Sequence, residues 1–238
     1  MATLAGRLAV VTGGTRGIGR AVVERLLAQG ADVVATGRTV GGEVPKGARY
    51  EAVDCEDPEA VERFSEKLAD FEPDILINNA GINRNLPFAE IAPTLFARIQ
   101  HANVVAPFRF SQAVLAGMRT RKWGRIVSVS SIFGKISMAQ RASYSTSKFA
   151  LDGMMTALAA EVAADGILVN CVAPGFTETD LTRSMLGEKE MAELAARVPI
   201  RRLAQPDEVA VFTVWLAGPE NTYISGQNIA IDGGFTRV

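Results

Sequence analysis

The hydrophobic positions of the chain form short continuous runs, and longer segments with helical spacing separate them. The runs predict seven strands, at residues 8–11, 32–36, 50–53, 75–77, 126–129, 168–172 and 228–231. The segments between them predict helices, at residues 20–29, 58–70, 93–118, 142–164 and 206–217. Strands that are apolar on both faces and alternate with helices are typical of a parallel sheet. We therefore expect an α/β fold in which a seven-stranded parallel sheet has helices on both faces.

One segment interrupts this alternation. Residues 177–200 lie between the sixth strand and the last helix, and they mix turn residues with a short helical stretch at 188–197. An insertion of this kind beside a site is typical of a lid that closes over substrate. Because no linker or low-complexity segment divides the chain, we expect one domain over residues 1–238, with a substrate lid at 177–200.

The composition points to a small-molecule function. The chain has 238 residues, of which 48% are hydrophobic, and its formal net charge of −1 offers no basic surface, so we expect neither nucleic acid nor a membrane as partner. Cys55 and Cys171 are the only cysteines, and they have no metal-ligand spacing, so we expect no metal. No run approaches the roughly 20 apolar residues of a membrane span, and residues 1–7 lack the apolar core of a signal peptide, which predicts a cytoplasmic location.

A glycine-rich turn joins the first strand to its helix. Gly13, Gly17 and Gly19 stand there, and their missing side chains let backbone N–H groups approach a pyrophosphate at the positive helix end. The spacing Gly-x-x-x-Gly-x-Gly departs from the commoner Gly-x-Gly-x-x-Gly fingerprint, and such a turn can also serve packing alone. Within its strand–helix–strand unit, the turn indicates a dinucleotide site in a single Rossmann-type domain.

The end of the second strand indicates which dinucleotide binds. An acidic residue there holds a ribose 2′-hydroxyl, whereas a basic residue accommodates a 2′-phosphate. The chain has Thr36, Gly37 and Arg38 at this turn, and Arg16 in the glycine-rich loop adds a second phosphate partner. We therefore predict NADP(H) in preference to NAD(H), while the alternative is that both arginines are solvated surface residues.

Two residues at helical spacing carry the predicted chemistry. Tyr144 and Lys148 are four residues apart and project from one face of a predicted helix. A tyrosine with a pKa of about 10 is a poor base, but a nearby ammonium lowers that pKa, so that Tyr144 can exchange a proton with a substrate oxygen. Ser131 follows the fifth strand at the carboxyl edge of the sheet, where its hydroxyl can bind the substrate oxygen, and Ser130 is the competing candidate.

The ordered motifs resemble those of the short-chain dehydrogenase/reductase family. They are the glycine-rich loop, Asn-Asn-Ala-Gly at 78–81, Ser131, Tyr144 with Lys148, Asn-Cys-Val-Ala-Pro-Gly at 170–175 and Ile-Asp-Gly-Gly at 231–234. The resemblance spans residues 8–234 and is nearest to the branch of 3-oxoacyl-(acyl carrier protein) reductases. It implies an oxidoreductase that transfers hydride between nicotinamide and a carbonyl or secondary alcohol.

The resemblance also implies roles for individual residues. It places the serine 13 positions before the tyrosine, which selects Ser131 over Ser130, and it adds Asn103, which organises a water that links Lys148 to solvent. The implied catalytic set is Asn103, Ser131, Tyr144 and Lys148. The implied cofactor-binding residues are Gly13, Thr15, Arg16, Gly17, Ile18, Gly19, Arg38, Asp54, Asn79, Ala80, Gly81, Tyr144, Lys148, Pro174, Gly175 and Thr177.

Two departures from the family pattern concern the ends of the site. Residues 39–49, with Pro45, leave no room for the helix that most relatives have between the second and third strands. Asp165 stands where reductases acting on acyl carrier protein commonly have a basic residue, and Lys122 alone remains for that contact, which argues against carrier-protein docking. The pocket for the substrate is expected to be lined by Ile132, Phe133, Met138, Gln140, Phe176, Met185 and Leu186.

Three functions follow from these observations. The first is an NADP(H)-dependent oxidoreductase acting on a 3-oxoacyl-type small molecule, and the second is an NAD(P)-dependent dehydrogenase of a polyol, sugar or hydroxy acid. The third, from another class, is a dinucleotide-sensing module without catalysis. The resemblance further implies a homotetramer in which the helices at 93–118 and 142–164 pair across interfaces.

Overall fold

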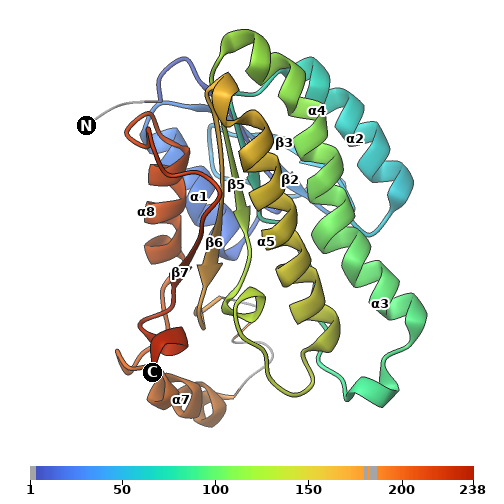
Figure 1. The fold of residues 1–238 in the computed structure, drawn as a ribbon, viewed down its shortest axis with the longest axis vertical. Helices are drawn as coiled ribbons and strands as arrows, with labels where there is room; N and C mark the ends of the chain where they lie inside the picture. Colours follow the sequence, from blue (N-terminus) through green and yellow to red (C-terminus); the bar gives the residue numbers. More distant parts are fainter. Residues whose placement is uncertain (1–3, 180–181, 183–186) are drawn as a thin grey trace.

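A parallel sheet forms the centre of the protein, whose computed structural model describes residues 4–179, 182 and 187–238 (Figure 1). Its strands are β1 (Leu8–Val11), β2 (Asp32–Gly37), β3 (Arg49–Ala52), β4 (Ile75–Asn78), β5 (Gly124–Val129), β6 (Ile167–Pro174) and β7 (Asn228–Ile231). They lie in the order β3-β2-β1-β4-β5-β6-β7, and every neighbouring pair is parallel. The seven-stranded parallel sheet is therefore confirmed. Because the strand order reverses between β1 and β4, the loops that follow these strands diverge and leave a crevice at the carboxyl edge.

Helices cover both faces of this sheet. α1 (Gly17–Ala28) and α8 (Pro206–Ala217) pack on one face. α2 (Pro58–Phe71), α4 (Ala106–Arg121) and α5 (Ala142–Val162) pack on the other. α3 (Pro93–Gln100) leads toward α4, and α7 (Glu188–Arg197) lies beyond the carboxyl edge, near the C terminus (Figure 1). Short 3-10 turns are η1 (Phe88–Glu90), η3 (Ile132–Gly134), η4 (Ala163–Asp165) and η5 (Phe235–Arg237).

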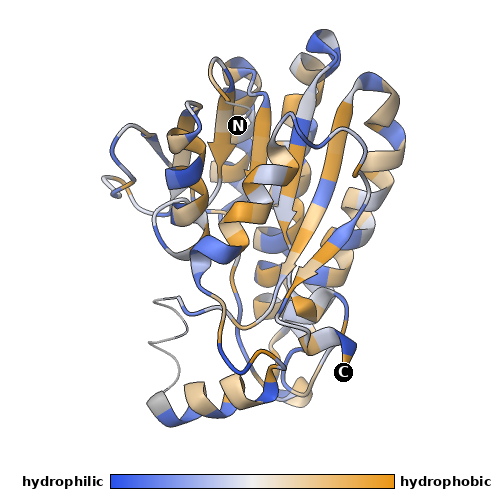
Figure 2. Ribbon diagram, turned by 90° about the vertical axis from the view of Figure 1, so that its left-hand side faces the viewer, coloured by the Kyte–Doolittle hydropathy of each residue, from blue (hydrophilic) through white to orange (hydrophobic). Residues whose placement is uncertain are grey.

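Successive strand residues point to opposite faces and so divide between two cores. Val10 and Leu76 pack with α2, α4 and α5, whereas their neighbours Val11 and Ile77 pack with α1 and α8. Figure 2 shows the hydrophobic residues concentrated along the central strands. None of the helices in the described parts of the chain has the length and hydropathy of a bilayer-spanning segment.

The predicted helix at residues 93–118 is interrupted by one wider turn. This turn, η2 (His101–Val105), is a π-helix, in which the N–H of Ala106 donates to the carbonyl of His101, five residues earlier. A π turn accommodates one extra residue and usually marks a functional site. Here it carries the buried side chain of Asn103, which is bound to the backbone of Ile82 after β4. Hydrophobic periodicity does not report such a turn, so the sequence predicted one continuous helix.

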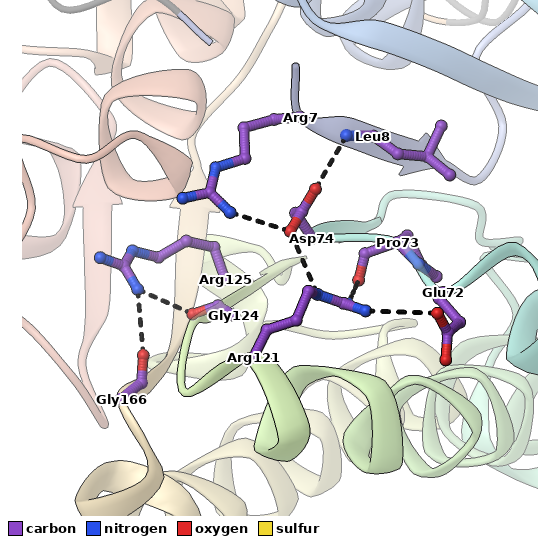
Figure 3. Close-up of polar contacts among 9 residues, drawn as sticks. All are labelled: Arg7, Leu8, Glu72, Pro73, Asp74, Arg121, Gly124, Arg125 and Gly166. Atoms are coloured by element: carbon purple, nitrogen blue, oxygen red, sulfur yellow. Dashed lines mark hydrogen bonds and ion pairs between the residues drawn. The ribbon is translucent and has the colours of Figure 1, made fainter. Parts of the chain in front are cut away.

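A polar cluster closes the amino ends of the strands, opposite the crevice (Figure 3). The buried carboxylate of Asp74 accepts hydrogen bonds from the backbone N–H of Leu8 and from Arg7, each at 3.0 Å, and Arg121 Nε lies 3.3 Å away. Arg125 is 5% exposed and donates to backbone carbonyls, and its burial lowers its pKa to about 10. The cluster joins the starts of β1, β4 and β5.

The connection from β2 to β3 contains no helix, as predicted, and residues 39–48 form turns instead. The Tyr50 hydroxyl donates to the carbonyl of Thr39, which holds the connection against β3. The Tyr50 ring also lies against Gly42, where an added Cβ would be 2.7 Å from the ring carbon that bears the hydroxyl. Tyr50 therefore lines this end of the crevice, next to the connection that lacks a helix.

Candidate active site

The crevice contains a cavity of about 680 Å³ along the carboxyl ends of β1, β2, β4, β5 and β6. It is lined by Ser131 and by every predicted cofactor-binding residue, namely Gly13, Thr15, Arg16, Gly17, Ile18, Gly19, Arg38, Asp54, Asn79, Ala80, Gly81, Tyr144, Lys148, Pro174, Gly175 and Thr177. Of the predicted catalytic and cofactor-binding residues, Asn103 alone is absent from the lining, and none of the described residues expected to line the substrate pocket belongs to it. No group of three or more His, Cys, Asp or Glu side chains is placed to hold a metal in the described ranges.

The glycine-rich loop makes one end of the cavity. Gly13 and Gly17 have φ of +69° and +55°, a region that favours glycine. At Gly19 a Cβ would lie 2.1 Å from the carbonyl oxygen of Gly13, so only a bare backbone fits where α1 meets the loop after β1. An added Cβ at these three positions would meet protein atoms, so the glycines line the cavity with bare backbone, and this cradle fits the approach of a pyrophosphate.

The start of α1 faces this cradle without an internal cap. The side chain of Arg16, the residue before the helix, makes no capping hydrogen bond, and the first turn holds no acidic residue. The unpaired N–H groups and the positive end of the helix dipole therefore favour an anion in the cavity.

Thr12 and Asn79 fix the glycine-rich loop to the end of β4. Thr12 Oγ1 accepts hydrogen bonds from the backbone N–H groups of Asn79 and Ala80, each at 3.0 Å. Asn79 Nδ2 donates to the carbonyls of Thr12 at 2.9 Å and Gly13 at 3.0 Å. Asn79, predicted as a cofactor contact, thus also shapes the loop. Thr12 was missed, because a threonine at the end of a strand carries no motif signal.

The predicted phosphate-binding arginine is held by an acidic residue that the sequence reading did not single out. Arg38 Nη2 lies 3.3 Å from Glu56 Oε1, and Arg98 on α3 binds the other oxygen of the same carboxylate. Asp54 lies beside them and accepts the N–H of Glu56 at 2.9 Å. Arg38, Asp54 and Glu56 all line the cavity, together with Glu43 of the β2–β3 connection and Arg16 of the glycine-rich loop, so this end contains both arginines and carboxylates.

Ser131 and Tyr144 come together at the other end of the cavity. Ser131 begins the turn η3, and Tyr144 lies in the first turn of α5. Burial raises the pKa of Tyr144, whereas a hydrogen bond with the Ser131 side chain and the positive charge of Arg141 act to lower it. The neighbour Ser130 instead turns toward the backbone carbonyl of Lys148, at 3.4 Å. Both serines line the cavity, and the choice of Ser131 over Ser130 stays a prediction.

The Lys148 ammonium lies beside the Tyr144 ring and is bound to a backbone carbonyl. Lys148 Nζ donates to the carbonyl of Val129 at 2.8 Å and lies 5.6 Å from the centroid of the Tyr144 ring. Burial lowers the pKa of Lys148 to about 8. The hydrogen bond with Ser131 and the charge of Arg141 are the influences that lower the Tyr144 pKa in this structure, and the effect of Lys148 on that pKa stays a prediction.

Asn103 lies one layer behind the cavity. Its Oδ1 accepts the N–H of Ile82 at 2.8 Å, and its Nδ2 donates to the carbonyl of Ile82 and to Ser147 Oγ, each at 2.9 Å. A Cβ added at Gly81 would be 3.1 Å from Asn103 Oδ1 and 3.7 Å from Lys148 Nζ. Asn103 thus joins the loop after β4 to α5 close to Lys148. Its neighbour His101 binds the carbonyl of Cys55 through Nδ1, at 3.0 Å, which is a structural contact.

The loop after β6 completes the cavity. A Cβ at Gly175 would lie 2.8 Å from Asp232 Cα, so this position requires glycine. Thr177 Oγ1 donates to the carbonyl of Gly175 at 3.2 Å, which folds the loop back on itself. Of the residues expected to line the substrate pocket, Phe133 contacts both Tyr144 and Phe176 edge-on, with ring centroids 6.5 and 6.3 Å apart.

The other residues expected to line the substrate pocket lie in several different segments. Ile132 and Phe133 are buried in η3. Met138 is partly exposed, and Gln140 adopts a left-handed conformation at φ +65°. Met185 and Leu186 lie outside the described residues, as do 180–181 and 183–184 of the predicted lid.

Comparisons with known proteins identify relatives over nearly the whole chain. The family model described as enoyl-(acyl carrier protein) reductase matches residues 13–236. The 3-oxoacyl-acyl-carrier-protein reductase FabG of Vibrio cholerae is 37% identical over 239 residues, which cover 97% of this chain and 98% of that protein.

Solved structures are also similar to this chain over nearly its whole length. A structure from Beutenbergia cavernae, described as a candidate NAD(P)-dependent gluconate 5-dehydrogenase with bound NADP at low occupancy, has a TM-score of 0.92 at 34% identity and is matched over 99% of each chain. Another, described as a short chain dehydrogenase/reductase family protein, has a TM-score of 0.91 at 33% identity and covers 99% of this chain and 100% of that one.

Proposed function

We propose that this chain, which belongs to the short-chain dehydrogenase/reductase family of oxidoreductases, uses NADP(H) to interconvert a small-molecule carbonyl and its secondary alcohol. The observation that carries the proposal is the pairing of Tyr144 with Ser131 in the same cavity as the glycine cradle. The cradle fits a dinucleotide, because Gly13, Gly17 and Gly19 leave bare backbone at the uncapped start of α1.

Tyr144 and Ser131 have different roles in the proposed reaction. A bound nicotinamide supplies or accepts the hydride, and the protein handles the proton. Tyr144 gives its phenolic proton to the substrate oxygen during reduction and takes it back during oxidation. Ser131, which lines the cavity with Tyr144, donates its hydroxyl to the same substrate oxygen and stabilises the charge that develops there.

Lys148 and Asn103 are positioning residues in this account. Lys148 Nζ, held by the carbonyl of Val129 in the cavity lining, is assigned to the nicotinamide ribose. Asn103 fixes the loop after β4 against α5 and so holds Gly81 and Lys148 at a fixed distance from each other. The π turn around Asn103 makes this contact possible, since it places the amide toward Ile82.

NADP(H) is favoured at the β2 end of the cavity. Arg38 and Arg16 line it, and both can pair with a 2′-phosphate. The nearby Asp54 and Glu56 argue for a preference over NAD(H) that is limited in size, because their carboxylates oppose a phosphate dianion. We assign Gly13, Thr15, Ile18, Asn79 and Ala80 to the diphosphate and ribose, and Pro174, Gly175 and Thr177 to the nicotinamide.

A free small molecule is the expected substrate, in preference to an acyl group on a carrier protein. Lys122, the basic residue left for docking, pairs with Asp165 at 2.8 Å, and Arg119 binds the same carboxylate at 3.0 Å. The segment at 177–200 is the proposed lid over this substrate. Exposed Phe108 on α4 and Phe149 on α5 support the proposed homotetramer, in which these helices pair with their symmetry mates.

A substrate panel tests the proposed function. Purified protein is incubated with NADPH or NADH and a set of ketones, oxo acids, oxoesters and oxo sugars, and the loss of reduced cofactor is followed by absorbance. We expect turnover with at least one carbonyl and a higher kcat/KM with NADPH. Tight NADPH binding without oxidation on the whole panel would favour the dinucleotide-sensing alternative. Light scattering that reports only a monomer would contradict the tetramer.

A further inference from the structure

A half-buried arginine next to Tyr144 has no part in the proton transfer itself. Arg141 immediately precedes α5, three residues before Tyr144. Its guanidinium lies 4.9 Å from the centroid of the Phe133 ring, which contacts the Tyr144 ring edge-on. The charge of Arg141 is also one of the influences on the phenolic hydroxyl. Arg141 is therefore linked to the Tyr144 ring through Phe133.

The charge of Arg141 has no carboxylate partner among the described residues. Its polar contact is with Asn85, whose Oδ1 accepts a hydrogen bond from Arg141 Nη1 at 2.6 Å. Burial lowers the Arg141 pKa, since the guanidinium is partly removed from water. A dehydrated cation with a neutral partner is strongly stabilised when an anion binds to it.

Asn83 extends this arrangement into the cavity. Its Nδ2 donates to Asn85 Oδ1 at 3.1 Å, so Asn85 joins Asn83 to Arg141. Asn83 lines the cavity together with Ser131 and Tyr144. Its Oδ1 is buried and has no hydrogen-bond partner in the part of the chain that the structure describes. An unpaired buried acceptor is destabilising, and the hydroxyl of a ligand would satisfy it.

We propose that Arg141, Asn85 and Asn83 form a subsite beside Tyr144 that binds the carboxylate and a hydroxyl of a hydroxy or oxo acid. The inference rests on the proposed oxidoreductase function and names its substrate class. The planar guanidinium can hold a carboxylate through two parallel hydrogen bonds, while Asn83 Oδ1 accepts from a hydroxyl. A neutral ketone or ester leaves Arg141 without a counter-charge, so the subsite selects acids over their neutral analogues.

Matched acid and neutral substrates test the subsite. The pairs are 5-keto-D-gluconate with L-sorbose, and acetoacetate with ethyl acetoacetate, each measured with saturating NADPH. In the unmodified protein we expect the acid to have the higher kcat/KM. In Arg141→Gln the acid/neutral ratio should fall about 10-fold or more, mainly through KM, because a charge-assisted hydrogen bond is lost. Asn85→Asp, which offers Arg141 an internal carboxylate, should lower the ratio while the arginine remains.

Controls separate this proposal from folding defects. Arg141→Lys should retain part of the acid preference, and Arg20→Gln, a matched loss of charge on α1 where Arg20 pairs with Glu24, should leave the ratio unchanged. NADPH binding by fluorescence titration reports whether each variant is folded. An unchanged ratio in Arg141→Gln, or a preference of the unmodified protein for the neutral substrates, would overturn the subsite.

A second measurement keeps the two proposals apart. Turnover of carbonyls without acid preference contradicts the subsite alone, whereas no turnover of any carbonyl contradicts the proposed function. In that case D-gluconate is titrated calorimetrically into the protein saturated with NADP⁺. Binding that weakens about 10-fold in Arg141→Gln supports the subsite, and equal binding or no binding by the unmodified protein refutes it.

Discussion

Replacing Arg38 by alanine should selectively weaken the binding of NADPH. Arg38 is the basic residue at the end of β2, and its side chain is 59% exposed while it pairs with Glu56 at 3.3 Å. A hydrogen bond to a charged group contributes about 1.5–3 kcal/mol, and solvent screening reduces this at an exposed position to about 1–2 kcal/mol. We therefore expect the Kd for NADPH to rise about 5- to 30-fold in Arg38→Ala. The Kd for NADH, which lacks the 2′-phosphate, should change less than about twofold.

Replacing Glu56 by glutamine should have the opposite effect on the same cofactor. The Glu56 carboxylate is shared by Arg38 and Arg98, and it must give up Arg38 when a phosphate binds. Removing its charge relieves this competition and the repulsion of the phosphate. We expect NADPH to bind a few-fold more tightly, on the order of 0.5–1 kcal/mol for one screened charge, with little change for NADH.

Fluorescence titrations of NADPH and NADH at two ionic strengths measure both effects. Added salt should weaken NADPH binding more in the unmodified protein than in Arg38→Ala, because the screened contact is already absent from the variant. Arg20→Ala is the matched control, since Arg20 is similarly exposed on α1 but lies outside the cavity. Equal losses for NADPH and NADH in Arg38→Ala, or a marked NADH preference of the unmodified protein, would refute the assignment of the 2′-phosphate to Arg38.

Two further predictions concern stability and pH. Asp74→Asn should lower the free energy of unfolding by about 2–4 kcal/mol in urea denaturation, because Arg7 and Arg121 lose their shared buried carboxylate. Glu24→Gln, which breaks an exposed ion pair, is the control and should change the free energy of unfolding by less than about 0.5 kcal/mol. Equal effects of the two variants would contradict the stabilising role of the Asp74 cluster. Arg141→Gln removes a positive charge that lowers the Tyr144 pKa, so the limb of the pH–rate profile for alcohol oxidation that requires deprotonated Tyr144 should move to higher pH. An unchanged limb would show that Arg141 does not act on Tyr144, and a shift to lower pH would contradict the sign of the proposed effect.

The fold and most of the candidate site follow from local sequence patterns. The strands are apolar on both faces, so their runs marked all seven strands to within a few residues. The glycine-rich loop could be predicted because Gly19 leaves no space for a side chain where α1 crosses the loop. Ser131 and Tyr144 are brought together by their places at the end of β5 and the start of α5, which is a property of the parallel sheet.

The contacts that were missed depend on residues far apart in the chain. Glu56 carries no motif, and its role is visible only when Arg38 and Arg98 converge on it. The π turn was missed because one extra residue in a helical turn leaves no mark on the hydrophobic pattern. The position of the Lys148 ammonium depends on the carbonyl of Val129, a backbone group that no side-chain spacing reports.

The most direct test of the central claim is the turnover of Tyr144→Phe, which keeps the ring and removes the hydroxyl. With saturating NADPH and the preferred carbonyl of the panel, the rate of NADPH oxidation should fall about 10²- to 10⁴-fold, the range expected when a general acid is lost. NADPH affinity, measured in the same preparation, should remain within about twofold because the glycine cradle and Arg38 are untouched. Turnover equal to that of the unmodified protein would contradict the assignment of proton transfer to Tyr144.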